Sequence, residues 1–299
     1  AIVPLADPSS FNLAFRWRKS VDRLFEGLAL LGSLLGIVVF GLLLFSILSN
    51  GLSQLDWQFL TNFASRKPEE SGIFAALMGS AWLLVITAVF AFPIGIGAAI
   101  FLEEYVPTSF FSRLLEIKLT NLAAVPSILY GLLGLALFAR GLQPITGGRS
   151  ILSAGLVLAA IVLPLTIVST RTSLRAVPSS QRQAGYAVGM TRLQVIRHIV
   201  LPKAFAGIAT GLLLSLSRAI GATAPLIAVG AVAFVSFVPS FSIEGLQSDF
   251  TTLPTQIYYW VARPQEEFRA IAAAAIIVLG AIVLLINIIA VGLRDAYKK

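Results

Sequence analysis

Six long apolar segments are the feature that most constrains how this chain can fold. They cover roughly residues 25–49, 74–102, 119–138, 151–170, 206–236 and 269–292. A helix needs about 20 predominantly apolar residues to cross a bilayer, and every one of these segments is long enough. Charged residues make up only 12% of the chain, about half the share found in an ordinary soluble domain. The sequence therefore predicts an all-α, polytopic membrane protein with six transmembrane helices.

Prolines are expected to bend these spans rather than to end them. The four that lie within or near the end of a span are Pro93, Pro126, Pro164 and Pro225. In a membrane helix, neighbouring helices can satisfy the carbonyl that a proline leaves free. The prolines are therefore predicted to mark bends and not boundaries, and the length of the second and fifth spans implies tilt, a break, or helix that continues outside the bilayer.

The distribution of Lys and Arg predicts the orientation. If the N-terminus is cytoplasmic, 15 of the 22 Lys and Arg residues lie in cytoplasmic segments, six lie outside, and Arg218 lies within the fifth span. Cytoplasmic loops of membrane proteins carry an excess of these residues, so we expect both termini in the cytoplasm. The chain then has a cytoplasmic N-terminal segment (1–24), a transmembrane domain (25–293) and a cytoplasmic tail (294–299).

The same charges favour the lipid bilayer, and not a nucleic acid, as the partner surface. The net charge is +8, but no basic stripe with interleaved aromatic residues is present. The longest outside loop, 237–268, is expected to form a partly ordered cap at the membrane surface. Its residues Tyr258, Tyr259 and Trp260 resemble the aromatic anchors found at membrane interfaces.

Arg218 is a candidate substrate-binding residue because it lies inside a predicted span. It is about 12 residues into the segment 206–236, which would place it roughly 18 Å deep, near mid-membrane. A charge there costs about 2.5–3.5 kcal/mol on insertion scales, so the side chain should face protein or water. Its guanidinium suits an oxyanion such as phosphate or sulfate, through bidentate hydrogen bonds. The alternative is a structural arginine paired with a buried carboxylate or with carbonyls.

Helical spacing places small and polar residues on the same face as Arg218. That face contains Gly211, Ser215, Arg218, Ala222 and Pro225. A face of this kind is typical of a pathway lining. The candidate pathway residues are Arg218, Ser215, Ser217 and Thr223.

A basic segment, residues 171–202, separates the fourth and fifth spans. It contains five arginines and is followed by Lys203. Pro178 and Gly189 divide it into short helix-forming pieces, with serines available as N-caps. Tyr186, Met190, Leu193 and Ile196 recur at three- and four-residue spacing, which predicts a helical unit with an apolar face suited to a groove on another protein. The alternative is a solvated loop near anionic lipid.

Several absences argue against an enzyme. The chain has no G-x-x-x-x-G-K-[ST] loop for nucleotide phosphates, no H-E-x-x-H, no G-x-S-x-G and no cysteine. His198 is the only histidine, and metal sites need several ligands. Glu103 and Glu104 end the second span and are expected to be solvated, with Arg113 or Lys118 as alternative partners. We therefore predict no catalytic residue, metal site or cofactor in this chain, and an intramembrane enzyme is the least supported reading.

Residues 183–202 resemble the "EAA" loop of ABC importer permeases. The loop reads Glu-Ala-Ala, three residues, Gly, nine residues, then Ile-x-Leu-Pro, and the matching positions here are Gln183, Ala184, Gly185, Gly189, Ile199, Leu201 and Pro202. Gln183 and Gly185 depart from the pattern, but the spacing fits throughout. The resemblance implies that loop 171–205 carries a coupling helix seated in a cleft of a cytoplasmic ATPase.

Two further stretches are similar to the permeases of phosphate-specific (Pst) transport systems. Residues 121–131, NLAAVPSILYG, resemble their third-span motif, and residues 217–226, SRAIGATAPL, resemble their fifth-span signature. The Thr-Ala-Pro ending is closer to the PstA subunit than to PstC. Ala222 stands where the family has Glu, one helical turn from Arg218, so Arg218 needs a different counter-charge.

The resemblance implies a type I ABC importer permease fold in a bacterial plasma (inner) membrane. It implies a phosphate importer that works by alternating access. The partners would be a second, PstC-like permease subunit, an ATPase dimer that binds ATP-Mg, and a periplasmic phosphate-binding protein. The open alternatives are a sulfate or molybdate permease of the same class, and a stand-alone secondary transporter or channel.

Overall fold

The computed structural model describes residues 8–107, 110–240 and 242–296, apart from the side chains of 8–16 and 111–113. Helices are the only regular elements in these residues, as predicted. The chain divides into two compact units, Ala1–Asn50 and Gly51–Lys299. Residues 1–7 of the predicted N-terminal segment and 297–299 of the predicted tail lie outside the described residues.

The first unit is formed by one long helix, α1 (Pro8–Gly51). Its 44 residues correspond to about 66 Å at 1.5 Å per residue, which exceeds the roughly 30 Å hydrocarbon core of a bilayer. Large apolar side chains from Leu24 to Phe45 are exposed around it. A helix that is apolar on all sides is typical of a membrane span, as predicted for residues 25–49.

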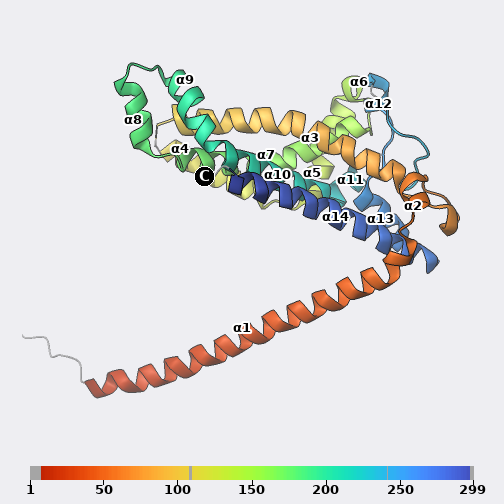
Figure 1. Cartoon of the computed structure of the whole chain (residues 1–299), viewed down its shortest axis with the longest axis horizontal. Helices are drawn as coiled ribbons and strands as arrows, with labels where there is room; N and C mark the ends of the chain where they lie inside the picture. Colours follow the sequence, from red (N-terminus) through yellow and green to blue (C-terminus); the bar gives the residue numbers. More distant parts are fainter. Residues whose placement is uncertain (1–7, 108–109, 241, 297–299) are drawn as a thin grey trace, which may run out of the picture. The chain divides into compact units, whose positions relative to one another are not determined.

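Four long helices run side by side through the second unit (Figure 1). They are α3 (Phe74–Ile100), α7 (Ile151–Arg175), α10 (Leu201–Ile220) and α14 (Glu267–Ala296). The most buried of them, α7, packs against both α3 and α10, and α10 also packs against α14. Pro93 and Pro164 lie inside α3 and α7, as predicted.

Small residues allow α10 to approach α7 closely. A Cβ added to Gly211 of α10 would lie 2.6 Å from Oγ of Ser169 in α7. Such an approach is available only to a residue without a side chain, and it brings the two backbones together as in other membrane helix pairs. The position of α10, and of the residues at its end, follows from this contact.

The third span differs from the prediction because it is broken at Pro126. Helix α4 (Phe110–Ala123) ends before Pro126, and α5 (Ser127–Gly134) continues into a π-helical segment, η4 (Leu135–Gly141). The two parts of this span meet at an angle of 92°. Proline lacks an N–H and disfavours helix in the residue before it, so Pro126 ends one helix and precedes the next. Among the described residues, five helices are long and apolar enough to cross a membrane, or six if this bent pair counts as one span.

The fifth span lies earlier in the chain than the predicted segment 206–236. The helical stretch runs from Arg192 to Ile220 through α9 (Arg192–Val195), the π-helical η5 (Ile196–Val200) and α10. After Gly221 a separate short helix, α11 (Ala224–Val229), begins with Pro225 in its first turn, where no N–H is needed. Pro225 therefore marks a boundary and not a bend. Arg218 lies in the last turn of α10, near the end of this helical stretch and not about 12 residues into a longer one, as was predicted.

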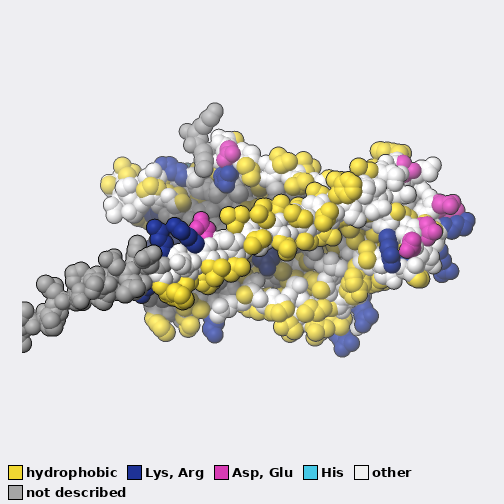
Figure 2. All heavy atoms as spheres, turned by 90° about the horizontal axis from the view of Figure 1, so that it is seen from below, with side chains coloured by type: hydrophobic (Ala, Val, Ile, Leu, Met, Phe, Trp, Pro, Cys, Tyr) yellow, Lys and Arg dark blue, Asp and Glu magenta, His cyan; other side chains and the backbone are white. Residues whose placement is uncertain are grey.

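Shorter elements complete the two ends of the second unit. They are η1 (Leu52–Gln54), α2 (Trp57–Thr61), η2 (Pro68–Glu70), η3 (Phe101–Tyr105), α6 (Gln143–Thr146), α8 (Ser179–Ala187), α12 (Ile243–Leu246) and α13 (Leu253–Val261). Helices α8 and α9 lie at one end, and α6 and α12 lie at the other (Figure 1). Hydrophobic side chains are exposed over much of the surface shown in Figure 2, as expected for helices that lie in a bilayer.

The predicted aromatic anchors have different roles in the structure. Trp260 is completely buried in a core cluster with Phe59 and Phe268, so its prediction as an interfacial residue was wrong. Tyr258 is exposed, whereas the Tyr259 hydroxyl donates a hydrogen bond to the Ala231 carbonyl at 2.9 Å. Burial raises the pKa of Tyr259, which keeps the hydroxyl protonated as a donor.

Candidate functional site

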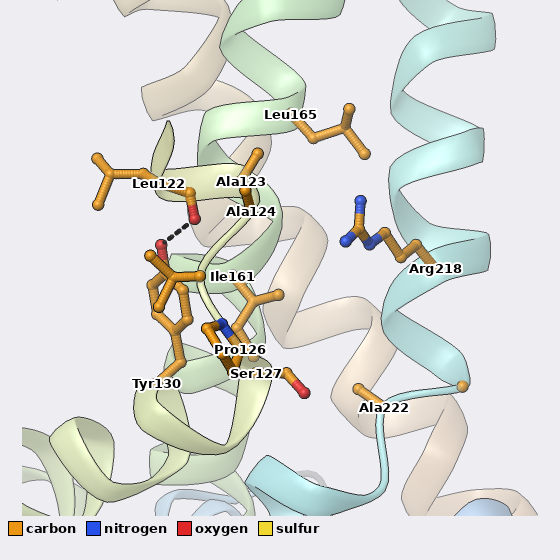
Figure 3. Close-up of a pocket in the computed structure, with 12 residues that line it drawn as sticks. Leu122, Ala123, Ala124, Pro126, Ser127, Tyr130, Ile161, Leu165, Arg218 and Ala222 are labelled. Atoms are coloured by element: carbon orange, nitrogen blue, oxygen red, sulfur yellow. Dashed lines mark hydrogen bonds between the residues drawn. The ribbon is translucent and has the colours of Figure 1, made fainter. Parts of the chain in front are cut away.

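A cavity of about 420 Å³ lies where the third span is broken and α10 ends (Figure 3). One wall comes from the α4–α5 connection, a second from α7 and a third from the end of α10. The lining residues are Leu122 to Ser127, Tyr130, Ile161, Leu165, Arg218, Gly221 and Ala222. Non-helical backbone at this position is consistent with a membrane protein, because such backbone is tolerated where it lines a cavity.

Two interruptions of the chain form this cavity together. Helix α11, which follows the end of α10, packs against α5, which follows the break in the third span. The packing is close because a Cβ on Gly131 of α5 would lie 2.6 Å from Cα of Pro225. The two short helices that begin at Pro126 and Pro225 therefore pack against each other beside the cavity.

Arg218 projects from α10 into the cavity, toward the α4–α5 connection (Figure 3). It is exposed, and it makes no ion pair or hydrogen bond with any residue that the structure describes. The guanidinium therefore has its donors available to a ligand. An always-charged group with free donors, at a cavity lined mainly by apolar and small residues, can bind an anion through charge-assisted hydrogen bonds.

The other predicted pathway residues do not line the cavity. Ser215 is fully buried, and its hydroxyl donates to the Gly211 carbonyl at 2.8 Å. Ser217, next to Arg218 in the chain, and Thr223, five residues after it, are half-buried and do not line the cavity. Their roles in a pathway stay predictions.

Ser127 and Tyr130 line the cavity and were not among the predicted site residues. The Tyr130 hydroxyl donates to the Leu122 carbonyl at 2.9 Å, which ties α5 to the end of α4 across the break (Figure 3). Both residues belong to the stretch 121–131, whose proline was the available signal of a break. Ala222 also lines the cavity, although α10 ends at Ile220, so Ala222 and Arg218 are not one helical turn apart as predicted.

The α8–α9 unit, residues 179–195, is the second candidate site. Its two helices are separated by Gly189, which has φ of +82°, a conformation that residues with side chains rarely adopt. Helix α9 begins with a capping box formed by Thr191 and Gln194. The prediction of two short helices divided at Gly189 is confirmed.

Gly185 explains one departure from the family's loop pattern. It is buried, and a Cβ there would lie 2.8 Å from Cδ1 of Ile199 and 2.9 Å from Cγ2 of Val195. Glycine therefore lets α8 pack closely against the start of the fifth span. Gln183 and Ala184 face outward, Ile199 and Leu201 are half-buried, and Pro202 is exposed in the first turn of α10.

Apolar side chains are exposed on the α8–α9 unit, as a docking surface requires. They are Tyr186, Val188 and Leu193. Met190 is half-buried, and Ile196, which was predicted to share this face, is buried in the core. The apolar face is therefore real but smaller than its sequence spacing indicated.

The basic segment is largely paired with acidic residues of other helices. Glu103 accepts from Nε of Arg171 at 3.2 Å and from Nε of Arg175 at 2.9 Å. Glu116 of α4 accepts two hydrogen bonds from Arg175, at 3.0 and 3.1 Å. Glu104 is buried beside Arg182. The prediction that Glu103 and Glu104 are solvated was wrong, because the ends of α3 and α7 bring them against these arginines.

Metal binding has no support in this part of the molecule. No group of three or more His, Cys, Asp or Glu among the described residues could hold a metal ion. The polar side chains that line the cavity are those of Arg218, Ser127 and Tyr130.

Known proteins similar to this chain are transport permeases. Residues 91–299 match the family model described as binding-protein-dependent transport system inner membrane component. The phosphate transport system permease protein PstA of Haemophilus influenzae is 29% identical over 277 residues, 93% of this chain and 95% of that protein. PstA 1 of Mycobacterium tuberculosis is 32% identical over 231 residues, 76% and 72% of the two chains.

Solved structures with the same fold also come from ABC importers. The crystal structure of a bacterial ABC transporter involved in the import of the acidic polysaccharide alginate matches with a TM-score of 0.64 and 16% identity, over 95% of this chain and 100% of that chain. An inward-facing MetNI methionine ABC transporter matches with a TM-score of 0.58 and 19% identity, over 76% and 98%. These matches show the type I importer permease fold. The chain therefore belongs to the family of binding-protein-dependent transport system inner membrane components, and it is an integral membrane permease subunit of an ABC importer.

Proposed function

We propose that this chain is the PstA-like permease subunit of an ATP-driven phosphate importer. The observation that carries the proposal is Arg218, a guanidinium without a partner among the described residues, at a cavity where two spans are interrupted. Such a group offers a fixed positive charge and a fork of donors that suits phosphate. The relatives named PstA support phosphate among the oxyanions.

The mechanism follows from the position of Arg218 between interrupted helices. A charge within a span costs about 2.5–3.5 kcal/mol on insertion scales, and an anion that passes the cavity offsets this cost transiently. A single arginine in a partly open cavity binds weakly enough to release the anion again. In alternating access, rearrangement of α5, α10 and α11 would open the cavity first to the outside and then to the cytoplasm.

The driving force would come from partner subunits. The chain contains no nucleotide-binding loop, so ATP-Mg would bind to a cytoplasmic ATPase dimer. The α8–α9 unit, with exposed Tyr186, Val188 and Leu193, suits a hydrophobic groove on that ATPase. A PstC-like second permease would complete the pathway, and a periplasmic phosphate-binding protein would deliver the substrate to it. This arrangement places both termini and α8 in the cytoplasm.

Uptake by the reconstituted complex tests the proposal. Vesicles containing this chain, its second permease and its ATPase, with the binding protein outside and ATP inside, should accumulate radiolabelled phosphate in preference to sulfate and molybdate. Arg218→Ala should abolish uptake while the complex still assembles. Arg140→Ala is the matched control, because Arg140 is also exposed and without a described ion pair, but lies outside the cavity.

Each other outcome has a defined reading. Preference for sulfate or molybdate would assign a different oxyanion to the same site. Normal phosphate uptake by Arg218→Ala would refute the role of Arg218. Uptake without ATP, together with failure of an ATPase to co-purify, would indicate a stand-alone secondary transporter or channel.

A further inference from the structure

Two neighbouring carboxylates at the end of α3 have different partners. Glu103 pairs with Arg171 and Arg175 of α7. Glu104 pairs with Arg182 of α8 at 2.8 Å. Successive residues of a helix point in different directions, so these adjacent side chains, both in η3, reach different neighbours. The end of α3 is thus joined to α7 by one residue and to the α8–α9 unit by the next.

Arg182 connects three helices through one guanidinium. Its Nη2 donates to Oε1 of Glu104 and to the Leu174 carbonyl, both at 2.8 Å. Its Nη1 donates to the Val177 carbonyl at 2.6 Å. Leu174 lies in the last turn of α7 and Val177 just after it, where helix carbonyls lack partners within the helix. Arg182 therefore joins α8 both to α3 and to the end of α7.

The Glu104–Arg182 pair is shielded from solvent. The side chain of Glu104 is 6% exposed and that of Arg182 is 18% exposed, against 60% and 75% for Glu70 and Lys67 in a surface pair. Removing one partner of a buried pair leaves an uncompensated charge and is far more costly than breaking a surface pair. The buried pair consequently resists separation when α8 is displaced.

A further polar contact from α8 to a span, besides those of Arg182, is weaker. Gln181 accepts a hydrogen bond from Nζ of Lys203 in α10 at 2.7 Å, and this contact is exposed. Glu104, by contrast, lies in the π-helical turn η3, a geometry often found at functional positions in helices. Through Arg182, displacement of α8 thus acts on the end of α3 as well as on the end of α7.

We infer that Glu104 and Arg182 are positioning residues that transmit displacement of the α8–α9 unit to α3. The inference rests on the proposed function, in which the ATPase moves this unit. When α8 shifts, the buried ion pair carries η3 and α3 with it. Because α3 packs along α7, the shift reaches the helix that lines the Arg218 cavity.

Transport stoichiometry in the reconstituted complex is the first test. Glu104→Gln and Arg182→Gln should each lower the phosphate imported per ATP hydrolysed by at least about fivefold, the lower range of coupling factors between distinct sites. The double variant should be no worse than Arg182→Gln alone, because that substitution already breaks the link to Glu104. Glu103→Gln is the matched control, since it weakens contacts to α7 but leaves the bond to α8. The inference would be overturned if Glu104→Gln left the phosphate imported per ATP unchanged. It would also be overturned if Glu103→Gln lowered this ratio as much as Glu104→Gln does.

A second measurement does not depend on phosphate or on an ATPase. The chain has no cysteine, so Ala184→Cys provides a unique site for a spin label on the exposed side of α8. In the purified chain, adding Glu104→Gln should increase the mobility of the label, and adding Glu103→Gln should not. Equal mobility in all three proteins would refute the link. If wild-type complex hydrolyses ATP without importing phosphate, the proposed function fails while the mobility test still decides the inference. Arg182→Lys, which keeps the charge, replaces Glu104→Gln if that variant does not fold.

Discussion

Gly131 and Pro225, 94 positions apart in the chain, are in direct backbone contact. A Cβ on Gly131 would lie 2.6 Å from Cα and 2.8 Å from the carbonyl oxygen of Pro225. This contact joins α5 to α11, the two short helices that follow the interruptions in the third and fifth spans. The cavity at Arg218 lies where these two interrupted elements pack against each other and against α7.

Gly131→Ala is therefore expected to impair the cavity as well as stability. The methyl group meets backbone atoms, which cannot move aside as a flexible side chain can, so α5 and α11 must separate. Overpacking of this kind costs about 1–3 kcal/mol. The measurements are the thermal unfolding temperature in detergent and the rate of phosphate uptake in vesicles. Both should fall in Gly131→Ala. Gly97→Ala in α3 is the control, because a Cβ at Gly97 has nothing within 4 Å. Equal unfolding temperatures and equal uptake in Gly131→Ala and Gly97→Ala would contradict the role of the Gly131–Pro225 contact.

Ala222→Glu should weaken phosphate transport. The new carboxylate would stand in the same cavity as Arg218 and offer it a partner within the chain. Pairs exposed to water contribute about 0.2–1 kcal/mol, so the KM for uptake should rise by up to about fivefold. Ala222→Gln has nearly the same size without the charge and should have a smaller effect. A KM that Ala222→Glu leaves unchanged would show that the counter-charge of Arg218 is unimportant.

The sequence predicted the long helices well because their apolar runs are uninterrupted. The predicted spans 74–102 and 151–170 agree with α3 and α7 to within a few residues. The segment 206–236 was misplaced because hydropathy continues past Gly221, whereas the helix does not. Hydropathy measures the cost of entering lipid, and it does not report where a proline begins a new helix. The same limitation concealed the break at Pro126.

Besides the helix breaks, the sequence could not predict contacts between residues that are far apart in the chain. Glu103 and Arg171 are 68 residues apart, and their pairing depends on how α3 packs against α7. Arg218 was recognised as unusual because a charge within an apolar segment is visible locally. Its neighbours Ser127 and Tyr130 were not identified, since their approach to α10 depends on a 92° bend that no local pattern specified.

Trp260→Ala should destabilise the protein strongly, whereas Tyr258→Ala should not. Trp260 is fully buried beside Phe59, and replacing a buried aromatic residue by alanine costs about 3–5 kcal/mol. Tyr258, two positions earlier on the same helix, is 54% exposed. Thermal unfolding of the two variants in the same detergent checks the prediction. Similar unfolding temperatures would mean that the cluster around Trp260 contributes little.

Substitutions at Gly189 separate backbone geometry from docking. Because its φ is +82°, an alanine there is strained by roughly 1–2 kcal/mol, whereas asparagine adopts this conformation more readily. A Cβ at this position would meet nothing within 4 Å, so strain is the only local consequence within the chain. We expect Gly189→Ala to shift α8 relative to α9 and to reduce co-purification of the ATPase, with Gly189→Asn retaining most of it. If both variants lost the ATPase equally, the side chain itself would obstruct docking, and Gly189 would lie at the interface rather than shape it.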